Sequence, residues 1–324
     1  MMKTLMNRAA AGIQRLWEAS RPLTAAGLGL LILFGVTMAP LAVDPHVITG
    51  VPAWLKPAKF AISTSVYALT LAWVMTYLRD WPRLTRLVGW TTGAVLVIEV
   101  VLIDLQAVRG VTSHFNTATA FDAAVFTVMG ISILVAWAMA IALTVALFRQ
   151  SFADPALGSA IRVGMLVTVI GSGAGGLMTR PTSAQLEHVR TTHSMPVVGA
   201  HTVGAADGGP GIPVTGWSRE HGDLRVAHFL GLHAIQTIPA LVWLVGRRAS
   251  PQLRRRALLV ISLSYASLFA ILLGQALSGQ SVLAPQGAAL DALIAWLVAT
   301  ALGLVFVRLA RRDDPQTLRM RVAR

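Results

Sequence analysis

Two short segments gather most of the side chains able to do chemistry. One is Arg109–Asn116 (RGVTSHFN), which brings an arginine, a serine and a histidine close together. The other is Asp223–Gln236 (DLRVAHFLGLHAIQ), which holds an aspartate, an arginine and the histidines His228 and His233. Histidine acts as a general acid or base near neutral pH, and its neutral ring also binds metals and haem. These two segments are therefore the first candidates for a functional site.

Two carboxylates lie in the apolar run 87–108 that precedes the first segment. Glu99 is about twelve residues into this run, near mid-membrane at a rise of about 1.5 Å per residue. A carboxylate at that depth costs at least about 2.5 kcal/mol and marks a functional position by default. Glu99, Gln106 and Arg109 share one helical stripe, whereas Asp104 lies about 140° from Glu99. We predict catalytic roles for Glu99, Asp104 and Arg109; the alternative is that Glu99 is a protonated carboxyl bonded across helices.

The composition requires a membrane to position these residues. Of 324 residues, 55% are hydrophobic and 13% are charged, whereas soluble domains carry about 25% charged residues. A soluble enzyme is therefore nearly excluded. The chain has no cysteine, which excludes disulfides, thiolate metal sites, iron–sulfur clusters and covalently attached haem.

Eight stretches are long and apolar enough to cross a bilayer, which needs about 20 such residues. They predict an all-α polytopic membrane protein. The stretches are Leu23–Val43, Phe60–Leu78, Leu87–Val108, Phe121–Phe148, Ile161–Met178, Ala227–Val245, Ala257–Leu277 and Ala288–Val307.

The basic residues orient these spans. A cytoplasmic N-terminus puts 20 of the 27 lysines and arginines on one side, in every second connection, as the positive-inside rule requires. We therefore predict a bacterial-type inner membrane protein with both termini in the cytoplasm, and no nucleic-acid partner. All eight histidines then lie at or beyond the outer, periplasmic boundary, so the site is expected to face a small molecule or redox partner there.

An internal repeat is predicted from a shift of 169 residues. The shift aligns Gln106 with Gln275 and Asp122 with Asp291, together with turn residues between the spans. It divides the chain into two four-helix halves, related by a pseudo-twofold axis along the membrane normal. The predicted parts are an N-terminal cytoplasmic segment 1–22, halves 23–148 and 161–307 with an outer loop 179–226, and a basic tail 308–324.

The shift also separates scaffold residues from specialised ones. Asp122 and Asp291 both fall in the first turn of a predicted helix, which suits capping. Glu99 and His114 align with leucines in the second half. The residues without a counterpart therefore suit one specialised site.

A membrane redox protein is the first functional hypothesis, with a b-type haem or a divalent metal ion as cofactor. His114 and His233 are the expected axial ligands, His228 is a further candidate, and Lys59 or Arg109 is expected to pair with propionates. The eight-helix layout with outward histidines resembles that of haem A synthases. The resemblance implies a haem protein, but helices two, four and eight lack the intramembrane histidines of that family.

Two further hypotheses remain open. A metal-dependent enzyme acting on a lipid-like substrate at the outer face would use His201 and Asp223 with His114, His228 or His233, although no diagnostic motif is present. A proton-coupled transporter would use Glu99 and Arg109, but the predicted cytoplasmic half offers few polar residues for an inward path.

Overall fold

The computed structural model describes residues 2–245 and 249–312. Arg247 and Arg248 of a predicted cytoplasmic loop, and the predicted tail from residue 313 onward, lie outside the described residues. The chain forms two compact units. Unit 1 comprises Met1–Ala146, Met178–Ala200 and Asp207–Gly216, and unit 2 comprises Leu147–Leu177, His201–Ala206 and Trp217–Arg324.

The described residues contain seven helices long and apolar enough to span a membrane, or up to eight if one bent pair counts as a span. The chain is therefore a multi-pass, all-α membrane protein, as the hydropathy predicts. Its few strand residues form two short antiparallel pairs, β1 (Val47–Ile48) with β2 (Val51–Pro52) and β3 (Thr202–Val203) with β4 (Gly222–Asp223).

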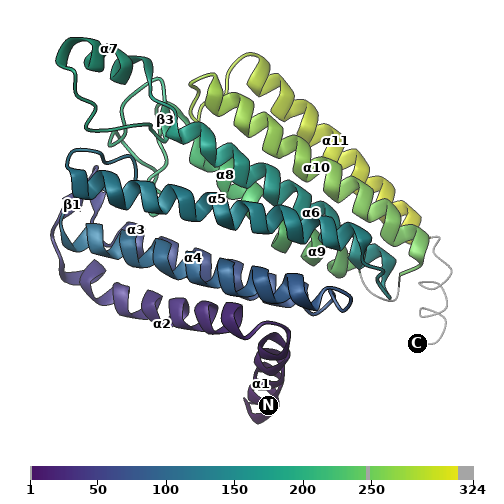
Figure 1. Ribbon diagram of the computed structural model, residues 1–324. Helices are drawn as coiled ribbons and strands as arrows, with labels where there is room; N and C mark the ends of the chain where they lie inside the picture. The colour runs from purple at the N-terminus through teal and green to yellow at the C-terminus, as the bar shows by residue number, and fades with distance from the viewer. Residues whose placement is uncertain (1, 246–248, 313–324) are drawn as a thin grey trace. The chain divides into compact units, whose positions relative to one another are not determined.

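Unit 1 is built around four long helices (Figure 1). Helix α2 packs against α3 and α4, and α3 packs against α4. The Ser65 hydroxyl of α3 donates to the Gly27 carbonyl of α2 at 2.6 Å, a polar link of the kind that holds membrane helices together. The helices of unit 1 are α1 (Met2–Ala19), α2 (Arg21–Val43), α3 (Leu55–Met75), α4 (Pro82–Val108), α5 (Ala120–Arg149) and α7 (Ser183–Thr192).

The connection from α2 to α3 is fixed by Asp44. Its carboxylate accepts hydrogen bonds from the His46 N–H at 2.9 Å and from the Trp54 indole at 2.8 Å. These bonds, the one from the His46 backbone first, hold the pKa of Asp44 below its ordinary value. The start of α3 is thereby tied to the end of α2.

Unit 2 has a core made by three helices. Ala160 and Val167 of α6 pack with Ile238 of α9 and Tyr265 of α10. The elements of unit 2 are α6 (Pro155–Ala174), the 3-10 turn η1 (Gly175–Thr179) that leads out of it, α8 (Leu224–Leu232), α9 (Ala234–Val245), α10 (Pro251–Leu277) and α11 (Ala288–Arg312).

Asp154 begins α6 and links it to α10. It caps the helix by accepting from the N–H groups of Ala156 and Leu157, and it pairs with Arg254 at 2.7 Å. Burial raises the pKa of Asp154, but Arg254 and the two N–H groups outweigh burial and lower it overall.

The sixth predicted span is broken, which the hydropathy did not predict. Helices α8 and α9 meet at His233 with a bend of 52°. Thr168 of α6 satisfies the break, because its hydroxyl donates to the Leu232 carbonyl at 3.3 Å and accepts from the Ile235 N–H at 3.2 Å. The Tyr265 hydroxyl donates to the Leu230 carbonyl at 2.6 Å. A helix break inside a membrane is tolerated when neighbouring side chains satisfy the freed backbone groups in this way.

Helices α4 and α10 end in the same local structure. Each spans 27 residues and has a proline in its first turn. Each is followed by a glycine of positive φ, Gly110 at +70° and Gly279 at +77°. In both, the next N–H returns to a glutamine carbonyl, Val111 to Gln106 at 3.0 Å and Gln280 to Gln275 at 3.2 Å. This is a Schellman cap, which needs a residue able to adopt the left-handed region after the helix.

Candidate functional site

Three charged or titratable side chains meet in unit 1. The His114 Nε2 atom lies 3.4 Å from Glu99 Oε1, and its Nδ1 atom lies 3.0 Å from Lys56 Nζ. Glu99 comes from α4, Lys56 from the first turn of α3, and His114 from the connection between α4 and α5. The imidazole therefore stands between an ammonium group and a carboxyl group.

The site grades from partly exposed to buried. The His114 side chain is 22% exposed, whereas that of Glu99 is 2% exposed. The second oxygen of Glu99, Oε2, is buried and accepts no hydrogen bond among the described residues. Such a carboxyl group is most stable when protonated, because burial disfavours its charged form.

Aromatic rings surround the imidazole. The Phe60 ring centroid lies 5.6 Å from that of His114, and the Phe115 centroid lies 6.1 Å from it. Phe126 of α5 packs edge-on against Phe115 at 5.8 Å. An apolar wall of this kind strengthens the electrostatic interactions within the site.

A buried network anchors the connection that carries His114. Asp122 Oδ1 accepts from Gln106 Nε2 at 2.9 Å and from Arg109 at 2.5 Å, and its Oδ2 accepts from Thr119 at 2.6 Å. Arg109 also donates to Gln106 Oε1. The predicted stripe therefore divides: Gln106 and Arg109 bind Asp122, while Glu99 faces His114.

A distant segment covers the same connection. The residue pair Asn116 and Val197 forms an antiparallel bridge, and the Val198 N–H donates to the Phe115 carbonyl at 2.9 Å. Gly199 makes this fit possible, since a Cβ atom there would lie 2.3 Å from the Met178 carbonyl oxygen. The part of the predicted outer loop at 195–200 thus packs directly over the residue next to His114.

No family model, curated protein or solved structure matches this chain.

In unit 2, Asp223 forms a closed ion pair. Its carboxylate accepts from the Arg225 guanidinium at 2.9 and 2.6 Å, and from the Ser218 N–H at 2.8 Å. The Asp223 side chain is fully buried. Both oxygens already have donors, so this carboxylate has little capacity left for a metal ion.

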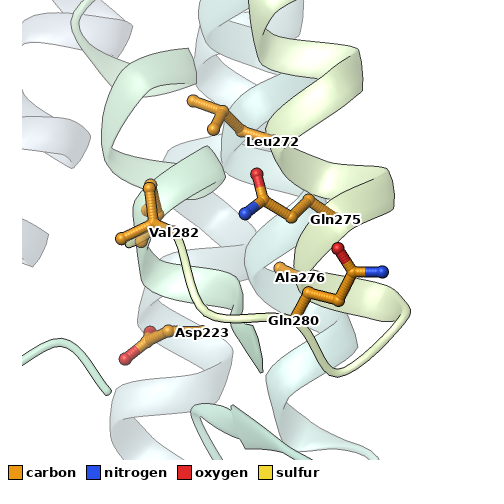
Figure 2. A pocket seen from close by; sticks show the side chains of 7 residues that line it. Asp223, Leu272, Gln275, Ala276, Gln280 and Val282 are labelled. Atoms are coloured by element: carbon orange, nitrogen blue, oxygen red, sulfur yellow. The ribbon is translucent and has the colours of Figure 1, made fainter. Parts of the chain in front are cut away.

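A small pocket lies beside this ion pair. Figure 2 shows Leu272, Gln275 and Ala276 along α10, with Asp223 and Val282 across from them. Gln275 is 2% exposed, and its Nε2 atom donates to the Ser281 carbonyl at 2.7 Å. Its Oε1 atom is buried and has no hydrogen-bond donor among the described residues.

His228 within α8 and His233 at the C-terminal end of α8 have different surroundings. His228 Nδ1 lies 2.8 Å from the Gly171 carbonyl oxygen of α6, so Nδ1 carries the hydrogen and Nε2 keeps its lone pair. His233, at the helix break, packs against the Phe229 ring with centroids 4.2 Å apart. The fold therefore gives the two histidines different neighbours.

The remaining predicted site residues are dispersed. Lys59 Nζ donates to the Thr215 carbonyl at 2.8 Å, and the His201 carbonyl accepts from the Leu224 N–H at 3.0 Å. Asp104 Oδ1 is buried without a donor among the described residues. Across residues 2–245 and 249–312, no group of three or more histidine, aspartate or glutamate side chains is placed to hold a metal ion.

Lys56 is the site residue that sequence reasoning missed. It lies in the first turn of α3, 58 positions before His114 in the chain. Its only signal was the pair of lysines in the segment WLKPAKF, which enters an apolar span. Lysines at the end of a span commonly extend to the membrane interface, so this pattern alone does not indicate a site.

Proposed function

We propose that this protein is a proton-coupled transporter, and that Lys56, His114 and Glu99 form its proton-transfer site. The observation that carries the proposal is the contact of one imidazole with both an ammonium group and a buried carboxyl group. Intramembrane carboxylates paired with histidines commonly mark proton pathways.

The proton transfer balances within this chain. His114 receives a proton at Nδ1, either from hydronium in the outer solution or from the Lys56 ammonium group, which the outer solution then reprotonates, and it releases the Nε2 proton to Glu99 Oε1. The Glu99 carboxylate becomes a neutral carboxyl, and its unpartnered Oε2 oxygen is then no longer a buried charge. The reverse sequence returns the proton to the surface that His114 reaches. The distance of 3.4 Å needs only a small closure for transfer, because catalytic hydrogen bonds are often long in resting structures.

The internal repeat is part of this proposal. The same shift of 169 residues that aligns the two sequence halves relates both ends of α4 to those of α10, and it relates Gly110 to Gly279. Two four-helix repeats with a pseudo-twofold axis along the membrane normal are a recurrent design of secondary transporters.

The broken helix also supports transport. Carriers often use discontinuous helices, because the free ends of the half-helices create polar positions within the membrane. Helices α8 and α9 provide such a break at His233.

The solute is expected to be a small molecule on the outer side. We infer from the positions of the basic residues that both termini are cytoplasmic and that the membrane is a bacterial-type inner membrane.

Charge displacement after a pH step tests the proposal. The full-length protein is reconstituted in liposomes on a solid-supported membrane, and the outer buffer is stepped from neutral to acidic pH. We expect a transient current in the wild type, because protons enter a site inside the low-dielectric layer. Glu99→Gln and His114→Gln are expected to remove it.

Glu187→Gln is the control, since it removes an exposed carboxyl group of unit 1 that pairs with Arg190 and is expected to keep the current. A wild type without a transient current, or a Glu99→Gln variant that retains it, contradicts the proposal. If Glu99→Gln fails to fold, His114→Gln and Lys56→Gln decide the question, because both replace partly exposed ends of the site.

A b-type haem or metal redox protein is the second proposal. His228 favours it, because a histidine whose Nδ1 donates to a carbonyl presents Nε2 for a metal in the usual orientation. His114 does not fit as an axial ligand in its present arrangement, since both of its ring nitrogens have partners. A Soret band that disappears in His228→Ala would favour this proposal over transport.

A further inference from the structure

Helix α1 has two different faces. In the helical projection, Met6, Ile13 and Trp17 fall within about 40° of one another, while Arg15 lies on the opposite side. The three apolar side chains are 63%, 43% and 42% exposed. A soluble surface would not leave such a stripe open to water along most of a helix.

This helix is not itself a span. Its 18 residues cover about 27 Å at 1.5 Å per residue, but Asn7, Arg8, Gln14, Arg15 and Glu18 give it too many polar groups for a span. A helix with one strongly polar face and one apolar face is typical of a position in the membrane interface.

The chain holds α1 at a membrane surface. Only Ser20 separates it from α2, and the Ser20 N–H donates back to the Leu16 carbonyl at 2.9 Å. Helix α2 begins at Arg21 and is itself a membrane span, so its first residue marks the edge of the bilayer. Figure 1 shows α1 turning away from the direction of α2 at this point.

Because α1 continues directly into the span α2, lipid is the expected contact of its apolar face. A bilayer surrounds α2 on its outward side, and it therefore reaches the adjacent end of α1. Trp17 lies four residues before the span, at the depth where tryptophan is enriched in membrane proteins. The sequence of this segment carries Lys3, Arg8 and Arg15 against a single acid, Glu18, which complements anionic headgroups.

We propose that α1 lies in the bilayer interface where α2 enters, with Met6, Ile13 and Trp17 facing the acyl chains and its basic residues drawing it to anionic lipid headgroups. The proposal is independent of the transport function.

The absence of native cysteine allows a direct test. Single cysteines replace Met6, Ile13, Gln14 or Arg15 in the full-length protein, and each is spin-labelled after reconstitution. The vesicles are either phosphatidylcholine alone or an equal mixture with phosphatidylglycerol. Power saturation then compares the access of lipid-soluble oxygen with that of a water-soluble nickel chelate.

We expect labels at Met6→Cys and Ile13→Cys to favour oxygen, and labels at Gln14→Cys and Arg15→Cys to favour the nickel chelate. The oxygen preference should increase in the anionic vesicles. Equal nickel access at all four positions would place α1 in water and overturn the proposal. Labels at Met6→Cys and Ile13→Cys that are shielded from both reagents would mean that protein, rather than lipid, covers this face. An identical pattern in the two lipid mixtures would refute the role of anionic headgroups.

Discussion

Replacing Gln106 or Gln275 by leucine should have opposite effects on stability. The two glutamines occupy the same position in the caps of α4 and α10, and both are buried, at 0% and 2% exposure. Their hydrogen bonds differ. Gln106 donates to Asp122 and accepts from Arg109, whereas Gln275 donates to the Ser281 carbonyl and leaves Oε1 without a donor.

The magnitudes follow from these partners. Gln106→Leu loses two hydrogen bonds to charged groups. Each contributes about 1.5 kcal/mol, the low end of the range for such bonds, because Asp122 and Arg109 remain paired with each other after the substitution. The leucine recovers about 1 kcal/mol through its apolar surface, so the net loss is about 2 kcal/mol. Gln275→Leu recovers the same apolar surface, about 1 kcal/mol. It loses one neutral hydrogen bond of about 1 kcal/mol and removes an unsatisfied buried oxygen that costs about 1–3 kcal/mol, so its net effect is stabilising by about 1–3 kcal/mol.

Reversible unfolding in mixed detergent micelles, followed by tryptophan fluorescence, measures this difference. The smallest expected separation, about 3 kcal/mol, corresponds to about a 150-fold ratio of unfolding equilibrium constants. Equal losses in the two variants would refute the reasoning, because they would show that burial of an amide, rather than its partners, decides stability. A large loss in Gln275→Leu alone would mean that Oε1 has a donor, such as a water molecule in the pocket of Figure 2.

Two further variants test the structure around the sites. Gly199→Ala should lower the thermal midpoint and loosen the segment over Phe115, because its φ is +101° and the new Cβ would lie 2.3 Å from the Met178 carbonyl oxygen. Gly209→Ala, where no atom lies within 4 Å of the new Cβ, should change little, and an equal loss in both would contradict the packing argument. Asp154→Asn should reduce the loss of stability in acid. The pKa of Asp154 is lowered in the folded state, so its carboxylate stabilises the fold at pH values above its ordinary pKa. This stabilisation is lost as the pH falls through the pKa of the folded state. Thermal midpoints measured on acidification should therefore fall less steeply in Asp154→Asn than in the wild type, and parallel curves would rule out this role.

Hydropathy predicted the membrane helices because long apolar runs have few alternatives in a bilayer. The break at His233 escaped prediction for the same reason. The run Ala227–Val245 averages as one apolar span, and the groups that satisfy the break, Thr168 and Tyr265, come from other helices. An average over one segment carries no information about a hydroxyl on its neighbour.

The sequence singled out Glu99 and His114 for separate roles, but it predicted neither their contact nor the part of Lys56. Helical periodicity placed Glu99 on one stripe with Arg109, and a stripe identifies a face without identifying what faces it. Arg109 lies at the end of α4, where its guanidinium forms an ion pair with the Asp122 carboxylate at 2.5 Å instead of with Glu99. The partner of Glu99 is His114, which follows the helix, because the connection folds back toward α4 after Gly110. Only the tertiary path of that connection brings the two together.

Each unit has a basic residue where a helix begins, Lys56 in α3 and Arg225 in α8, but the partners of the two residues differ. In unit 2 this charge is neutralised by Asp223, two residues away, in a pair whose carboxylate is fully buried. In unit 1 the position two residues before Lys56 is Trp54, which carries no charge. The ammonium group of Lys56 contacts a titratable ring instead, and that ring contacts a buried carboxyl group. An ion pair between Asp and Arg has no proton to exchange near neutral pH, whereas a histidine between lysine and glutamate does. Lys56→Gln should therefore weaken the pH-step current while leaving Glu99 and His114 in place, and an unchanged current would show that Lys56 has no part in the proton transfer.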